Sequence, residues 1–150
     1  MKTFSPGKVL LSVSTIYATV GPYVFDWNET HIYNPEWPPH AKFHNAQTMS
    51  TGVALGVAGL YATWTRRGRW TTGRLQASTA AASIYWITQL SAILYPGTAL
   101  LDHAREGAAE GPQAAPPRLC GPQPVVAGVA LAVNALAYGL ERRRLARRAA

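Results

Sequence analysis

Carboxylates and imidazoles gather in two stretches of this 150-residue chain, where they could carry out acid–base chemistry or bind a metal ion. Imidazoles titrate near neutral pH, carboxylates join them when partly shielded from water, and both types ligate divalent metals. The residues concerned are Asp26, Glu29, His31, His40 and His44 in the first stretch, and Asp102 and His103 in the second. Because all four histidines of the chain belong to this set, the elements that position it decide what the chain can do.

These elements are four long segments without a charged side chain, at about residues 9–25, 43–65, 75–101 and 122–140. A helix needs about 17–25 mostly apolar residues to cross a bilayer core about 30 Å thick. Only 14% of the residues are charged, against about 25% in soluble domains. We therefore predict an all-α integral membrane protein, an antiparallel four-helix transmembrane bundle that forms a single domain over residues 1–150. The single cysteine, Cys120, excludes a disulfide framework and a multi-cysteine zinc site.

The basic residues indicate how such a bundle is oriented. Eleven of the fourteen lie in the N-terminal tail, at residues 66–74 and in the C-terminal tail, which share one side of a four-span chain. Basic segments stay in the cytoplasm. The pattern predicts a multi-pass protein with both termini cytoplasmic, in the cell membrane of a bacterium or the endoplasmic reticulum of a eukaryote. The net charge of +7 is then explained by topology and by contact with membrane lipids, not by nucleic acid. The oligomeric state is left open.

The connection at residues 26–40 is expected to be a stiff, irregular loop on the outward side. It contains three prolines and the aromatic residues Trp27, Tyr33 and Trp37. Proline fixes φ and removes a backbone donor, and Trp and Tyr are favoured at membrane interfaces. We interpret this Pro/Trp-rich segment as a lid over the outward end of the bundle.

Polar residues at helical spacing form a stripe on each of the first three predicted spans. The first stripe comprises Ser12, Thr15, Thr19, Tyr23 and Asp26; the second comprises His40, His44, Gln47 and Thr51; the third comprises Thr88, Ser91, Tyr95, Thr98 and Asp102, with Tyr85 and Gln89 beside it. Ionisable residues in membrane spans usually face the interior of the bundle. We therefore expect the three stripes to face one another at the outward end. Gly52, Gly56 and Gly59 predict a close helix contact.

Three interpretations of the outward cluster are open. Metal-free acid–base catalysis would use Asp26, His40, His44 and Asp102 as acid, base or orienting groups, while Glu29, His31, Trp37, Gln47 and Tyr95 would contact the substrate. Metal binding would use His31, His40 and His44, because histidines four positions apart can share one ion; no other cofactor is implied. In the third interpretation the loop caps a non-enzymatic membrane module, either a partner subunit or a small transporter.

The string D-W-N-E-T-H-I-Y-N-P-E-W-P-P-H-A-K-F-H at Asp26–His44 resembles the signature of a family of small four-span membrane proteins of unknown function from bacteria and fungi. In its plan of four spans with acids and histidines at one mouth, the chain is also similar to the emopamil-binding-protein family of sterol isomerases. The same plan is similar to small membrane cyclases and epoxide-opening enzymes of natural-product pathways. These resemblances imply isomerisation, cyclisation, or epoxide opening or hydrolysis of a lipophilic small molecule. No motif of those enzymes aligns here, so no catalytic residue is carried over from them.

Overall fold

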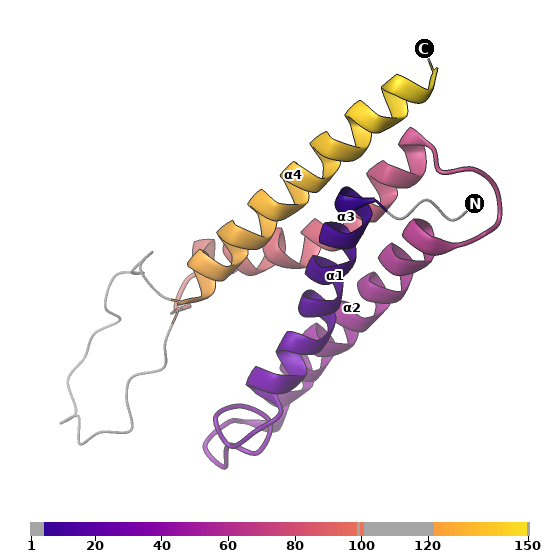
Figure 1. Ribbon diagram of the computed structural model, residues 1–150. Helices are drawn as coiled ribbons and strands as arrows, with labels where there is room; N and C mark the ends of the chain where they lie inside the picture. Colours follow the sequence, from indigo (N-terminus) through magenta and orange to yellow (C-terminus); the bar gives the residue numbers. More distant parts are fainter. Residues whose placement is uncertain (1–4, 99, 101–121, 150) are drawn as a thin grey trace.

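Four α-helices follow one another in the computed structural model, which describes residues 5–98, 100 and 122–149 (Figure 1). They are α1 (Pro6–Asp26), α2 (Pro39–Trp64), α3 (Thr72–Ser91) and α4 (Pro122–Ala149), with a short 3₁₀ helix, η1 (Ala92–Leu94), after α3. No strand occurs among the described residues. The predicted all-α class with four helices is thus confirmed for this part of the chain.

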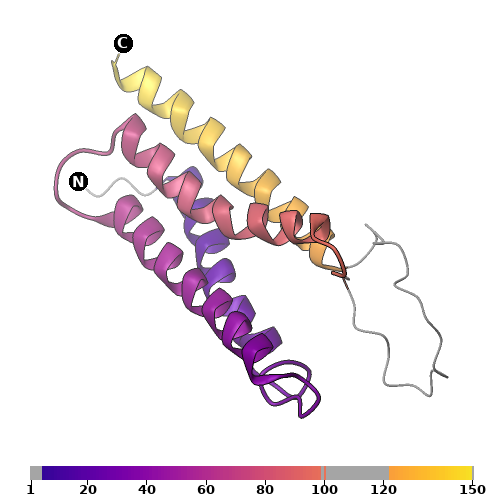
Figure 2. The same ribbon diagram turned by 180° about the vertical axis from the view of Figure 1, so that it is seen from behind.

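The bundle has two chemically different ends (Figure 1, Figure 2). The start of α1, the connection between α2 and α3, and the end of α4 lie together at one end, which we call the basic end because the described lysines and arginines other than Lys42 lie there. The connection between α1 and α2, at residues 27–38, lies at the opposite end, which we call the loop end. The basic segments therefore share one end, as their positions in the sequence predict.

The helix α3 is shorter than the charge-free segment at residues 75–101 predicts. Its α-helical part ends at Ser91, η1 continues only to Leu94, and Gly97 has a φ of 77°. Pro96 provides the reason, because a residue that precedes proline is pushed out of the α region. The Pro96–Gly97 pair therefore marks where the helical part of this segment ends.

Glycines bring α1 and α2 into close contact, as their spacing predicts. A Cβ atom added to Gly52 would lie 2.9 Å from the backbone oxygen of Ala18, and one added to Gly56 would clash with the Thr19 hydroxyl. Pro22 lies inside α1, and because proline has no N–H, the Ala18 carbonyl four residues earlier lacks its helical partner. The α2 backbone at Gly52 therefore packs against a carbonyl that α1 leaves unpaired.

Buried polar side chains join the helices at the basic end. Glu141 of α4 is 1% exposed, and its Oε2 accepts hydrogen bonds from Trp70 Nε1 at 2.9 Å and from Arg144 at 3.4 Å. Lys8 Nζ donates to the backbone oxygen of Thr63 at 3.0 Å and lies 4.1 Å from the centre of the Trp70 ring. Since a buried charge is tolerated only when it is partnered, this network ties α1, α2 and α4 to the connection that precedes α3.

Two of the four helices, α1 and α4, are long and apolar enough to cross a membrane. The helices α2 and α3 are also long, with 26 and 20 residues, but neither contains a stretch as apolar as those of α1 and α4. The sequence predicts four membrane spans. The length and apolar character of α1 and α4 support membrane association through these two helices. Membrane crossing by all four helices is part of the proposed function.

Candidate functional site

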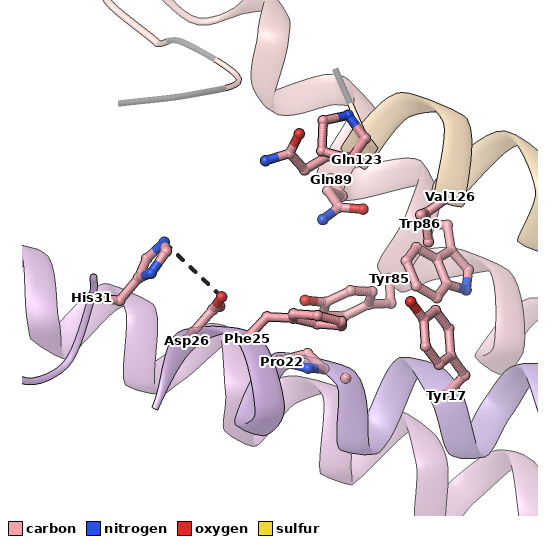
Figure 3. A pocket seen from close by; sticks show the side chains of 12 residues that line it. Tyr17, Pro22, Phe25, Asp26, His31, Tyr85, Trp86, Gln89, Gln123 and Val126 are labelled. Atoms are coloured by element: carbon pink, nitrogen blue, oxygen red, sulfur yellow. Dashed lines mark ion pairs between the residues drawn. The ribbon is translucent and has the colours of Figure 1, made fainter. Parts of the chain in front are cut away.

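A pocket of about 430 Å³ lies towards the loop end, between α1 and the ends of α3 and α4 (Figure 3). Tyr17 and Phe25 line the pocket although they are 41% and 59% exposed, so the pocket opens at the surface of the bundle. Its remaining lining residues are Gly21, Pro22, Asp26, His31, Tyr85, Trp86, Gln89, Pro122, Gln123 and Val126.

Asp26, the last residue of α1, supplies the carboxyl group of this pocket. Its side chain is 22% exposed. Oδ2 accepts a hydrogen bond from Asn45 Nδ2 of α2 at 3.2 Å, and Oδ1 lies 4.0 Å from Nε2 of His31 (Figure 3). A partly shielded carboxyl that is held on one side and faced by an imidazole on the other is suited to proton transfer.

The loop between α1 and α2 orients His31. Thr30 Oγ1 lies 2.6 Å from Asn28 Oδ1, which can only accept, so the Thr30 hydroxyl donates to Asn28. The same Oγ1 lies 2.7 Å from His31 Nδ1 and therefore accepts the Nδ1 proton. This arrangement gives neutral His31 the Nδ1–H tautomer, and Nε2, which faces Asp26, is the nitrogen that can accept a proton. The Trp37 ring packs edge-on against the imidazole, with 4.8 Å between ring centroids.

Several side chains at the pocket have buried polar atoms without a hydrogen-bond partner among the described residues. These atoms are Trp86 Nε1, Gln89 Oε1 and Gln123 Oε1, together with Asn45 Oδ1 beside Asp26. Leaving such an atom unpaired costs about 1–3 kcal/mol, and folded proteins contain few of them. Because these atoms have almost no accessible surface, a ligand would reach them only after the side chains shift; the pocket as it stands presents mainly aromatic rings, which suit the apolar part of a ligand.

The second predicted stripe does not reach the pocket, so the expectation that it faces Asp26 is corrected. His40, His44 and Gln47 lie on the exposed face of α2. The Nε2 atoms of the two histidines are 3.0 Å apart, and Nδ1 of His44 lies 3.2 Å from Oε1 of Gln47. The α2 residue that contacts Asp26 is Asn45, which is rotated by about 100° from His44 around the helix axis.

The third stripe also points away from the pocket where the structure describes it. Tyr95 is 67% exposed and lies beyond the end of α3. The Thr88 hydroxyl donates within its own helix, to the backbone oxygens of Ile84 and Tyr85. Such local bonds satisfy a hydroxyl on any face of a helix, which explains why this stripe does not mark the interior. Its neighbours Tyr85 and Gln89 line the pocket instead.

The remaining predicted residues lie around the site or outside the described part. Trp37 contacts His31 but does not line the pocket, and Glu29 is an exposed loop residue. Asp102 and His103 lie outside the described residues. Within the part of the chain that is described, no three side chains of His, Cys, Asp and Glu come together as a metal site, because His31 is separated from the His40–His44 pair.

Asn45 is the site residue that the predicted stripes miss, although the sequence contains a signal for it. Met49, Gly52, Gly56 and Gly59 are the buried residues along the middle of α2. Asn45 lies four residues before Met49 and seven before Gly52, so it continues this buried face towards the loop end. Extending the glycine stripe, rather than the histidine stripe, would have identified it.

The fold and the pocket define the class of this protein, a small all-α bundle with an open, partly polar pocket at one end. Its sequence matches the family of unknown function DUF6640 over residues 10–150, and the chain belongs to this family. No curated protein matches it, and no solved structure does. The predicted membership of an uncharacterised family is thus confirmed, whereas the similarity to sterol isomerases and membrane cyclases stays an expectation.

Proposed function

We propose that this chain is a multi-pass integral membrane enzyme that performs acid–base chemistry on a lipophilic small molecule. The reaction would be an isomerisation, a cyclisation, or an epoxide opening or hydrolysis. Asp26 would transfer the proton, and His31 would be its partner. The observation that supports this most directly is a mostly shielded carboxyl in a pocket otherwise lined by an imidazole, aromatic rings, two amides and small apolar residues.

The chemistry of the helix surfaces supports the membrane part of the proposal. The exposed hydroxyls of Thr48, Ser50 and Thr51 donate to backbone oxygens of α2 itself, at 2.8–3.0 Å. They therefore need no water, which a bilayer core does not provide. The shortest of the four α-helices, α3, has 20 residues and is about 30 Å long, enough to cross the apolar core. The basic end would face the cytoplasm under the positive-inside rule.

The geometry of the pocket supports proton transfer by Asp26. The separation of 4.0 Å between Asp26 and His31 is too long for a direct hydrogen bond, but a water molecule or a substrate hydroxyl can connect the two groups. A protonated Asp26 could donate to the substrate, and His31 Nε2 could accept a proton in the same turnover. Figure 3 shows the Tyr85 hydroxyl on the Asp26 side of the pocket, where it could bind a polar group of the substrate.

The proposal is tested with Asp26→Asn in the native host. Cells that lack the protein are complemented with the wild type or the variant, and their lipid-soluble metabolites are compared. We expect the variant to insert and fold normally, because asparagine can still accept the hydrogen bond from Asn45. Product formation should fall by about a hundredfold or more, the scale of a positioned acid or base, and the substrate should accumulate.

Glu36→Gln is the matched control, since it also converts a carboxylate into an amide but on an exposed residue outside the pocket. It should complement like the wild type. Near-normal product formation by a well-folded Asp26→Asn protein would refute Asp26 as the proton donor. Unchanged metabolites in cells without the protein would favour the non-enzymatic alternative, a partner subunit or small transporter.

A metal-binding function is the second candidate, and the geometry of His40 and His44 favours it. In a tetrahedral zinc site with Zn–N bonds of about 2.1 Å, two ligand nitrogens are about 3.4 Å apart. The observed 3.0 Å between the two Nε2 atoms is within a few tenths of an ångström of that value. The pair would supply two ligands, and water or another molecule would supply the others.

A further inference from the structure

Arginine side chains form a second hollow, at the basic end of α4. It has a volume of about 400 Å³ and is lined by Leu140, Arg143, Arg144, Arg147 and Arg148. Arg144 forms an ion pair with Glu141 at 3.4 Å. The other three arginines have no acidic partner among the described residues. Three uncompensated positive charges therefore border one hollow, and this arrangement favours an anion.

The hollow continues along α4 as an exposed apolar stripe. Val125, Val129 and Leu136 are 60%, 60% and 57% exposed, and Leu140 is 38% exposed. A helix repeats every 3.6 residues, so positions separated by three, four or seven residues share a face. By this spacing one face of α4 presents, in order along the chain, Val125, Val129, Leu136, Leu140, Arg143 and Arg147.

We propose that this face of α4 binds an anionic phospholipid, with the phosphate in the arginine hollow and an acyl chain along the apolar stripe. Arginine presents several N–H donors in a fork that matches phosphate oxygens. The inference uses the membrane-spanning α4 of the proposed function, but it does not depend on the chemistry of the pocket.

The dimensions of the face fit one leaflet of a bilayer. Half of the apolar core is about 15 Å deep, and the eleven residue steps from Val129 to Leu140 extend over about 16 Å of helix. An acyl chain whose phosphate lies among the arginines would therefore run along this part of the stripe. A free phosphate or a nucleic acid would use the arginines but would leave the apolar stripe uncovered, so the combined face favours a lipid.

The test uses the full chain purified in a neutral detergent and titrated with phosphatidylglycerol or phosphatidylcholine. Binding is measured as the rise in unfolding temperature and as lipid adducts in native mass spectrometry. Each arginine near an anionic lipid contributes about fivefold to affinity. The double variant Arg143→Gln/Arg147→Gln should therefore bind phosphatidylglycerol about 25-fold more weakly, whereas phosphatidylcholine should bind weakly to both proteins.

The control is the double variant Arg66→Gln/Arg67→Gln, which loses the same charge from exposed residues of the basic end outside the hollow. It should bind phosphatidylglycerol within about twofold of the wild type. An equal loss in both double variants would overturn the site in favour of general charge attraction. Equal binding of phosphatidylcholine and phosphatidylglycerol by the wild type would also overturn it.

Two further arms distinguish the source of the phosphate. Leu136→Gln interrupts the apolar stripe and leaves the arginine hollow intact. It should therefore weaken the binding of phosphatidylglycerol. Inorganic phosphate or a short oligonucleotide that binds as tightly as phosphatidylglycerol and displaces it would overturn a lipid site. Asp26→Asn should leave the lipid titration unchanged, so a failure of the proposed function and a failure of this inference give different results.

Discussion

Asn45 and His44 are neighbours in the sequence, yet one contacts the pocket carboxyl and the other lies on the surface. Asn45 donates to Asp26 at 3.2 Å, while the ring of His44 contacts His40 on the exposed face of α2. Residue types that can do chemistry are therefore not enough to locate a site. A rotation of α2 by one residue position would turn His44, instead of Asn45, towards Asp26. The contact with Asp26 gives Asn45 a positioning role that its residue type alone would not suggest.

The His40–His44 pair leads to a prediction about metal binding. Protein purified without chelators, in detergent and with trace-metal-free buffers, is analysed for zinc, copper and iron. If the pair forms a site, the wild type should bind the metal, and His40→Ala/His44→Ala should lose it. The single variants should lose most of the affinity, because one imidazole remains and a chelated pair becomes a single ligand.

His31→Ala is the control for this experiment, since His31 lies beside Asp26 and Trp37 rather than beside the pair. Its metal content should equal that of the wild type. Equal metal content in the wild type and in the double variant would contradict a site at His40 and His44.

At the scale of the helices, the sequence predicts which segments are helical better than it predicts how they are turned. Charge-free segments predict the four helices, and Gly52 and Gly56 predict the close contact between α1 and α2. The polar stripes fail as guides because hydroxyls such as Thr51 and Thr88 bond to their own backbone and so are satisfied on either face. The position of His31 could not be predicted either, because the loop at residues 27–38 sets it through side-chain hydrogen bonds.

The contact between α1 and α2 gives a prediction about stability. In Gly52→Ala the new Cβ atom would lie 2.9 Å from the Ala18 backbone oxygen, and a backbone atom cannot move aside without shifting α1. We expect a loss of about 1–3 kcal/mol, the usual cost of overpacking, seen as a lower unfolding temperature in detergent.

Gly139→Ala in α4 is the matched control, because no atom lies within 4 Å of the added Cβ. Alanine favours a helix over glycine by about 1 kcal/mol, so this variant should be as stable as the wild type or slightly more stable. If Gly52→Ala were also stabilising, the close packing of α2 on the Ala18 carbonyl would be disproved.

At the scale of the whole molecule, the two ends differ in what lies between the helices. The basic end is held together by the buried network of Glu141, Trp70 and Lys8. Towards the loop end, α1 separates enough from α3 and α4 to leave the pocket. A lipophilic substrate that enters from the membrane could therefore reach Asp26 from the side of the bundle while the basic end stays closed.

The orientation of the bundle is the last prediction. The basic residues of the tails and of the connection between α2 and α3 lie at one end, and basic segments remain in the cytoplasm. A reporter enzyme that is active only outside the cytoplasm should therefore be silent when it is fused after Ala150. The same reporter should be active when inserted near Gly111, since four spans would place that segment on the other side.

Replacing Arg66, Arg67 and Arg69 by glutamine should weaken this preference, because it removes positive charge from the connection between α2 and α3. An active reporter after Ala150 combined with a silent one near Gly111 would reverse the topology and place Asp26 on the cytoplasmic side. Activity or silence at both positions would exclude four spans, because the single span α4 lies between the two insertion sites and must place them on opposite sides of the membrane.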